Sequence, residues 1–235
     1  MGSKISVIVP TFEEEKYIGY LLKDLKAQTY PPHEVIVVDG RSKDRTSRIV
    51  KKNKNVKYIT SRANVAYQRH RGAKSAIGDL LVFLDADVRI APNFLKDVNR
   101  FFAREDIVIA CPLYFPTERH FPSLVLYAFF NMIFLLVQKI MPSGAGSCII
   151  VRRKEYFEIG GFDERYTYDD MQLLSRSKKL KKFKILILIV HVSNRRIKKL
   201  GFFRSASLYL KLSWYFIKND YEGANSIKYP FGSYS

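Results

Sequence analysis

Residues 80–90 read LLVFLDADVRI, an apolar run that ends abruptly in Asp85 and Asp87 with one alanine between them. A short apolar run bounded by polar residues is typical of a strand buried on both faces. Two carboxylates close together repel each other, so a cation must lie nearby or one carboxylate must take up a proton. The stretch therefore indicates a buried strand with a charged site at its end.

Similar apolar runs recur over the first 110 residues and are separated by helical stretches. The expected strands are 5–10, 34–40, 56–59, 79–84 and 107–111. The first expected helix has apolar residues at the i, i+3, i+4 and i+7 positions of one face, namely Ile18, Leu21, Leu22 and Leu25. Further helices are expected from a cap at Asp44 or Ser42 to about Lys52, over 64–76 and near 92–103. This alternation predicts right-handed βαβ units and an α/β fold with a mostly parallel sheet flanked by helices.

The pattern changes after residue 112. Residues 121–141 are apolar nearly all round, but the uninterrupted stretch is too short for a transmembrane helix, which needs about 20 residues, and Asn131 lies in its middle. A buried core helix and an interfacial helix both fit this run. Beyond it we expect a turn over 142–147, a strand from 148, a helix from about Asp169, a strand over 184–192, and one or two amphipathic helices in the last forty residues.

The charge of the chain is strongly positive and unevenly placed. The formal net charge is +18 over 235 residues, and thirteen Lys or Arg but no Asp or Glu lie between Met171 and Asn219. Such an excess favours an anionic partner, which could be nucleic acid, an anionic membrane surface or a phosphorylated substrate. A plain solvated surface is the alternative, but it would not need Trp214 and the other aromatic residues of this segment.

The two cysteines and the first residues bear on the compartment. Cys111 and Cys148 both lie beside apolar residues, which is typical of reduced core thiols in a cytosolic protein; a structural disulfide is the alternative. Residues 1–9 run directly into a strand pattern without a signal-peptide pattern, so we expect the fold to start there.

Polar side chains follow three of the expected strands. Asp39 and Asp85 each end an apolar run, and residues 10–14 follow the first strand. Ligands of open parallel sheets bind beyond the carboxyl ends of the strands, so these residues should meet in one crevice. A hard divalent cation, Mg²⁺ or Mn²⁺, would hold the carboxylates together. Its remaining positions could bind a diphosphate and stabilise the charge that develops as the diphosphate leaves.

Five segments, taken together, resemble the family 2 glycosyltransferases, which have the GT-A fold. They are VIVPTFEEEKYIGYLLKDL (7–25), VVDGRSKDRT (37–46), FLDADV (83–88), GAGSCIIVRRKEYFEIGGFDERYTYDDMQL (144–173) and HVSNRR (191–196). They occur in the order found in that family and cover roughly residues 4–200. The resemblance implies a GT-A-like domain over 1–200, with a donor half of about 1–111 and an acceptor half of about 112–200. Residues 201–235 would form an amphipathic helical extension.

The resemblance also implies a nucleotide site and a metal site. The nucleotide-binding residues would be Pro10, Thr11, Phe12, Glu14, Asp39, Arg69, Asp85, Ala86, Arg195 and Arg196. Among them, the arginines would approach the diphosphate, for which the guanidinium is suited by its bidentate donation. Asp87 would ligate a Mn²⁺ or Mg²⁺ ion, with Asp85 near it, and His191 would be the third protein contact to the metal.

The general base would be the second residue of the pair Asp169 and Asp170, which occupies the Glu-Asp position of the family. Inverting transfer from a nucleoside diphosphate needs a base opposite the leaving group to deprotonate the acceptor hydroxyl. A carboxylate next to another carboxylate and a diphosphate should have a raised pKa, which suits that role. Capping of the helix N-terminus is the alternative role for either aspartate.

The sequence thus predicts an inverting glycosyltransferase that uses a UDP- or GDP-sugar. Its acceptor could be lipid-linked, such as a polyprenyl phosphate, and the enzyme is expected on the cytoplasmic face of the membrane as a peripheral protein. His70 stands where the family often has Asn, and Glu13 replaces another usual Asn, so the nucleobase is left open.

Two other classes fit less well. A sugar-phosphate nucleotidyltransferase would need a glycine-rich basic loop after the first strand, where this chain has PTFEEE. A nucleic-acid-binding module is suggested by charge alone, without zinc spacing, an RNP motif or a helix-turn-helix signature.

Overall fold

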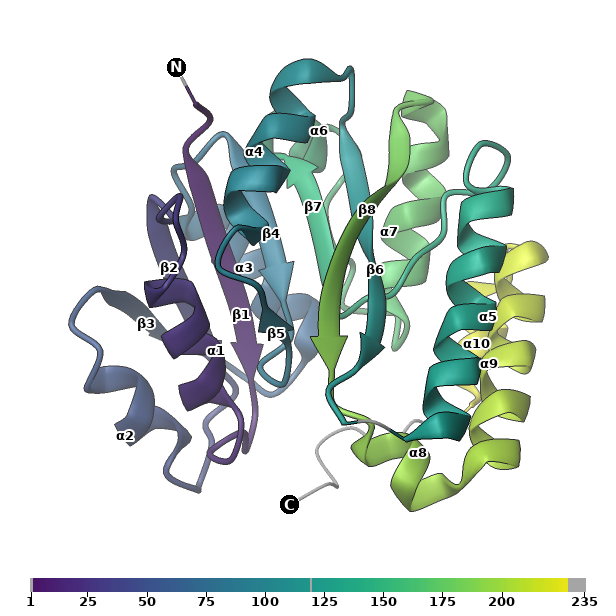
Figure 1. The fold of residues 1–235 in the computed structure, drawn as a ribbon, viewed down its shortest axis with the longest axis horizontal. Coiled ribbons are helices and arrows are strands. Elements are labelled where there is room, and N and C mark those ends of the chain that lie inside the picture. Colours follow the sequence, from purple (N-terminus) through teal and green to yellow (C-terminus); the bar gives the residue numbers. More distant parts are fainter. Residues whose placement is uncertain (1, 119, 228–235) are drawn as a thin grey trace.

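A computed structural model describes residues 2–118 and 120–227, apart from the side chain of Arg196. In this part of the chain one sheet holds β1 (Ile5–Thr11), β2 (Glu34–Asp39), β3 (Val56–Thr60), β4 (Leu80–Leu84), β5 (Arg89–Ile90), β6 (Ile109–Pro116), β7 (Cys148–Arg152) and β8 (Phe183–Val192). The spatial order is β3-β2-β1-β4-β7-β6-β8-β5 (Figure 1). The expected strands are present, while β5 has only two residues and gives no apolar run by which to recognise it.

The sheet is parallel in its first half and mixed in its second. Strands β1 to β4 pair in parallel with one another, as expected for successive βαβ units. Strand β7 is antiparallel to both β4 and β6, and β8 is parallel to β6. The chain enters β7 at the carboxyl end of β4. The N–H of Asp85, just after β4, donates to the carbonyl of Ser147, just before β7, at 3.0 Å. This reversal brings the 143–147 turn to the edge where the aspartates lie.

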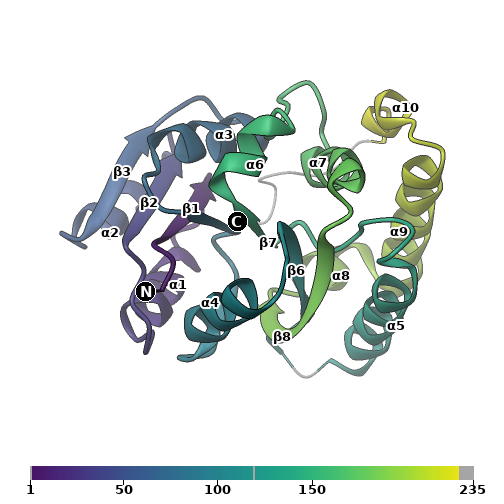
Figure 2. The same ribbon diagram turned by 90° about the horizontal axis from the view of Figure 1, so that it is seen from above.

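The described helices are α1 (Ile18–Lys26), α2 (Thr46–Lys51), α3 (Val65–Ser75), α4 (Phe94–Arg104), α5 (Phe121–Val137), α6 (Arg153–Glu158), α7 (Asp169–Ser177), α8 (Arg195–Leu200), α9 (Phe202–Ile217) and α10 (Tyr221–Asn225), with a short 3₁₀ turn, η1 (Lys178–Leu180). Helices α1, α2 and α4 pack on one face of the sheet, and α3, α6 and α7 on the other (Figure 2). Side chains alternate accordingly: Val7 and Val9 join the first core, and Ile8 joins the second.

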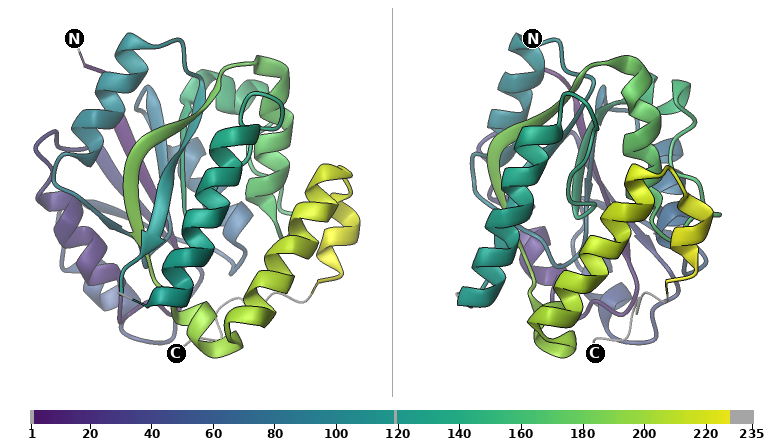
Figure 3. Two further views of the ribbon diagram at one scale, coloured as in Figure 1. Left: turned by 45° about the vertical axis from the view of Figure 1, so that its right-hand side comes forward. Right: turned by 90° about the vertical axis from the view of Figure 1, so that its right-hand side faces the viewer.

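Helices α5 and α9 lie side by side at one end of the molecule (Figure 3). The amide of Asn131 binds the backbone of Tyr114 on β6 twice: its Oδ1 accepts the N–H at 3.2 Å, and its Nδ2 donates to the carbonyl at 2.8 Å. Helix α5 is therefore fixed to the sheet along one side, while Phe121 and Leu136 on its other side are largely exposed. It is neither a fully buried core helix nor a free one.

Some local expectations need adjustment. The helix expected after Ser42 or Asp44 starts at Thr46, whose N–H donates to Asp44 at 2.9 Å, while the Ser42 hydroxyl donates to Asp39 instead. The expectation for the cysteines needs no adjustment, because Cys111 and Cys148 are both free, buried thiols. The predicted C-terminal extension falls partly on 228–235, which lie outside the described residues.

Candidate active site

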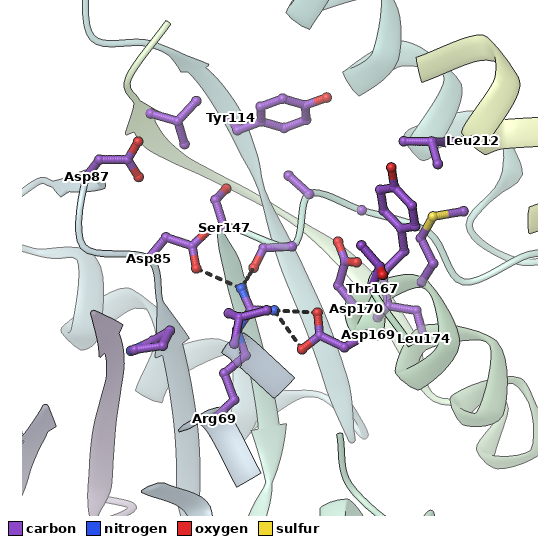
Figure 4. Close-up of a pocket in the computed structure, with 18 of the residues that line it drawn as sticks. Arg69, Asp85, Asp87, Tyr114, Ser147, Thr167, Asp169, Asp170, Leu174 and Leu212 are labelled. Carbon is purple, nitrogen blue, oxygen red and sulfur yellow. Dashed lines mark hydrogen bonds and ion pairs between the residues drawn. The ribbon is translucent and has the colours of Figure 1, made fainter. Parts of the chain in front are cut away.

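A cavity of about 600 Å³ opens beyond the carboxyl ends of β1 and β4 (Figure 4). Most of the predicted site residues line it, namely Pro10, Thr11, Phe12, Glu14, Arg69, Asp85, Ala86, Asp87, Asp169, Asp170 and Arg195. They come from the ends of β1 and β4 and from the starts of α3, α7 and α8. The cavity therefore gathers residues from opposite ends of the sequence, as expected for the carboxyl edge of a parallel sheet.

Arg69 joins the two sides of this cavity. Its Nη2 donates to Asp85 at 2.7 Å and to the carbonyl of Gly146 at 2.9 Å, and its Nη1 donates to both oxygens of Asp169 at 3.0 and 3.1 Å. Figure 4 shows the guanidinium between the two carboxylates. The side chain of Arg69 is only 5% exposed, and its contacts with the two carboxylates are charge-assisted. Arg69 thus ties the end of β4 to the start of α7.

Asp169 and Asp170 form the first turn of α7, and the residue at its N-cap is Tyr168. Burial raises the pKa of Asp169 to about 6, although the guanidinium of Arg69 acts against this shift. Burial also raises the pKa of Asp170, again opposed by Arg69. Both aspartates line the cavity, and both oxygens of Asp169 are bound to Arg69. The geometry therefore distinguishes Asp169, which holds the arginine, from Asp170, which does not.

The position of Asp170 depends on Gly146. A Cβ atom at that position would overlap the carboxylate of Asp170. The 143–147 turn therefore brings bare backbone against the aspartate, which leaves the carboxylate room to lie in the cavity (Figure 4). The sequence predicted only that these glycines form a turn. Their contact with α7 could not be predicted, because it exists only in the folded chain.

A second arginine lies on the donor side of the cavity. Arg195 donates to both oxygens of Glu14, at 3.0 and 2.6 Å, and its Nε lies 3.4 Å from Asp87. Its guanidinium also stacks over Tyr17, 4.9 Å from the ring centre. Burial raises the pKa of Glu14 despite this pairing. Asp85 and Asp87 therefore each have a different arginine as their cation, Arg69 and Arg195.

Asp39 lies below the cavity and is not part of its lining. It is 1% exposed and accepts hydrogen bonds from Thr11 at 3.2 Å, from Tyr58 at 2.8 Å, and from the N–H and hydroxyl of Ser42 at 3.1 and 2.5 Å. These contacts join the ends of β1, β2 and β3. Gln68, which no sequence motif pointed to, donates to the carbonyls of Thr11 and Val38 beside it.

The structure does not bring His191 to the cavity. Its side chain is exposed on β8, between the buried Val190 and Val192. Within 2–118 and 120–227, no three His, Cys, Asp or Glu side chains form a group that could hold a metal ion by themselves. The side chain of Arg196 lies outside the described residues, so its predicted contact with the diphosphate stays a prediction.

The charge of the cavity nevertheless suits a cation. Five acidic side chains and two arginines line it, which leaves a formal charge of −3 when all are ionised, in a chain of net charge +18. An anionic diphosphate would be repelled by this surplus unless a cation accompanied it. Asp85 and Asp87 offer hard oxygen ligands, and Mg²⁺ is commonly held by one or two carboxylates together with substrate phosphates. The residues present therefore fit a divalent cation.

The far side of the cavity is aromatic. Its lining includes Tyr114 from β6, Tyr127, Phe130 and Phe134 from α5, and Tyr209 and Phe216 from α9. The sequence did not predict this part of the site, because a run that is apolar on all sides gives no period to show which residues face inward. The cavity thus has one charged half and one aromatic half.

The sequence profile described as "Glycosyl transferase family 2" matches residues 6–160, which is more than half of the chain. The fold and the profile agree, and the chain belongs to this family of glycosyltransferases.

Curated relatives match over shorter stretches. The poly(ribitol-phosphate) beta-N-acetylglucosaminyltransferase TarS of Staphylococcus aureus is 39% identical over 106 residues, which is 42% of this chain and 18% of that protein. The dolichyl N-acetyl-alpha-D-glucosaminyl phosphate 3-beta-D-2,3-diacetamido-2,3-dideoxy-beta-D-glucuronosyltransferase of Methanococcus voltae is 34% identical over 102 residues, 40% of this chain and 32% of that protein. The matched stretch is thus less than a third of either relative.

Solved structures share the fold over most of the chain. The mannosyltransferase PcManGT from Pyrobaculum calidifontis, in complex with GDP-Man and Mn²⁺, has a TM-score of 0.65 at 21% identity, covering 82% of this chain and 57% of that one. TarS of S. aureus has a TM-score of 0.66 at 24% identity, covering 87% of this chain and 39% of that one. At these identities the likeness shows the GT-A fold alone.

Proposed function

We propose that this chain transfers a sugar, with inversion, from a UDP- or GDP-sugar to an acceptor hydroxyl or phosphate, with Asp170 as general base. The observation that carries the proposal is the pair of carboxylate sites on either side of Arg69. Asp85 and Asp87 end β4 on the donor side, and Asp170 faces the same cavity from α7. Inverting transfer needs this division, because the leaving group and the base act on opposite sides of the sugar.

The residues of the chain would divide the work as follows. Asp87, with Asp85 nearby, would hold a Mn²⁺ or Mg²⁺ ion, which when bound would stabilise the charge of the departing diphosphate. Arg195 lies on the donor side and Arg69 between the two sides, and the positive charge of both guanidinium groups would attract an anionic ligand. Asp169 would keep Arg69 in place, and Asp170 would take the proton from the acceptor. His191 would have to move toward the cavity to act as the resemblance implies.

The relatives support the choice of donor and acceptor. TarS has been solved with UDP and with UDP-GlcNAc, and PcManGT with GDP-Man and Mn²⁺. The M. voltae relative and a glucosyl-dolichyl phosphate glucuronosyltransferase of Haloferax volcanii are named for lipid-linked substrates. We therefore propose a lipid-linked acceptor and peripheral binding to the cytoplasmic face of the membrane. In the described part of the chain, no helix has the length and hydropathy needed to cross a bilayer.

The proposal is tested most simply by Asp170→Asn. This variant should bind UDP- or GDP-sugar almost normally but transfer it about 10²–10⁴-fold more slowly, which is the usual contribution of a positioned base. Because burial raises the pKa of Asp170, transfer by the parent enzyme should decline as the pH falls through that raised value. The residual rate of the variant should lack this decline. A product that keeps the donor's anomeric configuration would rule out the inverting mechanism.

Asp169→Asn is the matched control. It removes one of the carboxylates that pair with the buried guanidinium of Arg69, so it should destabilise the fold by up to about 3–5 kcal/mol. At a temperature where both variants are folded, Asp169→Asn should retain more transfer than Asp170→Asn. A larger loss in Asp169→Asn, per folded molecule, would show that the two roles have been assigned in the wrong order.

A further inference from the structure

Helix α5 has apolar residues on two opposite sides. The inner side lines the cavity with Tyr127, Phe130 and Phe134. The outer side exposes large apolar residues at helical spacing, namely Phe121, Val125, Phe129, Met132 and Leu136. A helix that faces water on its outer side normally carries polar residues there. Residues 121–137 contain no charged residue, so this helix does not follow that rule.

Helix α9 repeats the arrangement. Its inner side contributes Tyr209, Leu212 and Phe216 to the cavity. Its outer side exposes Phe203, Leu210, Trp214 and Ile217. The rings of Phe130 and Tyr209 lie 5.5 Å apart, so the inner sides of the two helices meet. Figure 3 shows both helices side by side on the same side of the molecule. From this placement we expect their outer apolar residues to lie next to each other.

Basic residues accompany this surface. Helix α9 carries Arg204 and Lys211, and Lys218 follows it, with its Nζ 4.6 Å from the ring centre of Trp214. The 47 residues between Met171 and Asn219 hold no acidic side chain. Trp, Phe and Leu on one side with Lys and Arg beside them are typical of helices that lie in the headgroup region of an anionic membrane. A contact with a second protein molecule would not by itself require one sign of charge.

We infer that the outer sides of α5 and α9 form the surface by which this protein docks on an anionic lipid bilayer, with the cavity directly behind them. This inference rests on the proposed function and adds the surface and the orientation. Because the inner sides of the same helices line the cavity, the aromatic half of the site lies about one helix diameter, roughly 10 Å, from the bilayer. An acceptor held in the membrane by an apolar chain could then present its head to the cavity without leaving the lipid.

The test is sedimentation with vesicles of phosphatidylcholine containing phosphatidylglycerol, compared with phosphatidylcholine alone. The parent chain should sediment with the anionic vesicles, and salt should weaken binding because it screens surface charge. The double variant Leu136→Ser/Trp214→Ser removes one exposed side chain from each helix. The partition of the double variant onto the vesicles should fall by about tenfold or more, because serine gains little from entering the apolar layer.

The matched control is Ile77→Ser. Ile77 is 68% exposed, close to the 73% of Leu136 and 57% of Trp214, but it precedes the central strand β4, and its N–H donates to Glu34 at the amino end of β2. It should leave vesicle binding unchanged. Equal losses in the control and the double variant, or no loss in the double variant, would overturn the inference. The inference would also be overturned if the parent chain did not bind vesicles but formed a dimer that the double variant disrupts. Calorimetry of donor binding, measured without lipid, reports separately on the proposed function.

Discussion

Arg69 shows how a single side chain can organise a site made of carboxylates. Its contact with Asp169 allows that carboxylate to be buried, which would otherwise cost several kcal/mol, and the same guanidinium pairs with the partly exposed Asp85. From sequence we expected this arginine to approach the diphosphate. Its partner Asp169 is 100 residues away along the chain, and that pairing depends on how α3 and α7 pack. No local pattern of residue types carries such information.

Gly146 supports a direct prediction about the base. In Gly146→Ala the new Cβ would overlap the carboxylate of Asp170, so the aspartate must turn out of its position. We expect transfer to fall by at least about tenfold, because a misplaced base loses much of its contribution. Donor binding, measured by calorimetry, should change little.

The control for this substitution is Gly19→Ala in α1. A Cβ there would meet only a side-chain methyl group of Ile49 at 3.7 Å, which is ordinary contact. Alanine in a helix is favoured over glycine by about 1 kcal/mol, so this variant should be as stable as the parent or more stable. Full transfer by Gly146→Ala would contradict the assignment of Asp170.

Among the elements, β1, β2 and β4 were the most predictable. Their apolar runs are bounded by polar residues, and the placement of Asp85 at the carboxyl end of β4 follows from the run alone. Helix α5 was less predictable, since a segment that is apolar all round does not show which side packs inward. The sequence therefore left a core helix and an interfacial helix open. The structure shows which side packs inward, because Asn131, which is polar and 4% exposed, binds the backbone of β6.

Asn131→Ala should loosen α5. The substitution leaves both backbone groups of Tyr114 without the amide that now binds them. Buried backbone groups that lose their partners cost about 1–3 kcal/mol, so the free energy of unfolding should fall by that amount in chemical denaturation. The exposed Asn53, whose amide donates to the carbonyl of Ile49, provides the comparison. If Asn53→Ala destabilises the protein as much as Asn131→Ala, the anchoring role of Asn131 is wrong.

Taken as a whole, the protein combines a basic surface with an acidic cavity. The chain carries a net charge of +18, whereas the ionisable groups that line the cavity sum to −3. Composition predicted an anionic partner but not this contrast, because the sum over a chain does not show where the charges lie. The basic surface would draw an anionic ligand toward the protein. Inside the cavity, a nucleoside diphosphate would still need a cation to offset the carboxylates.

The most direct measurement is a calorimetric titration of the protein with UDP, UDP-GlcNAc, GDP and GDP-Man, each with Mn²⁺ and with EDTA. We predict that one nucleotide series binds with Mn²⁺, and that its affinity falls by about tenfold or more in EDTA, at least about 1.4 kcal/mol. Asp87→Ala should lose this metal dependence while its thermal unfolding stays cooperative. Binding of neither series, or equal affinity with and without metal in both proteins, would contradict a metal-assisted nucleotide-sugar site at the end of β4.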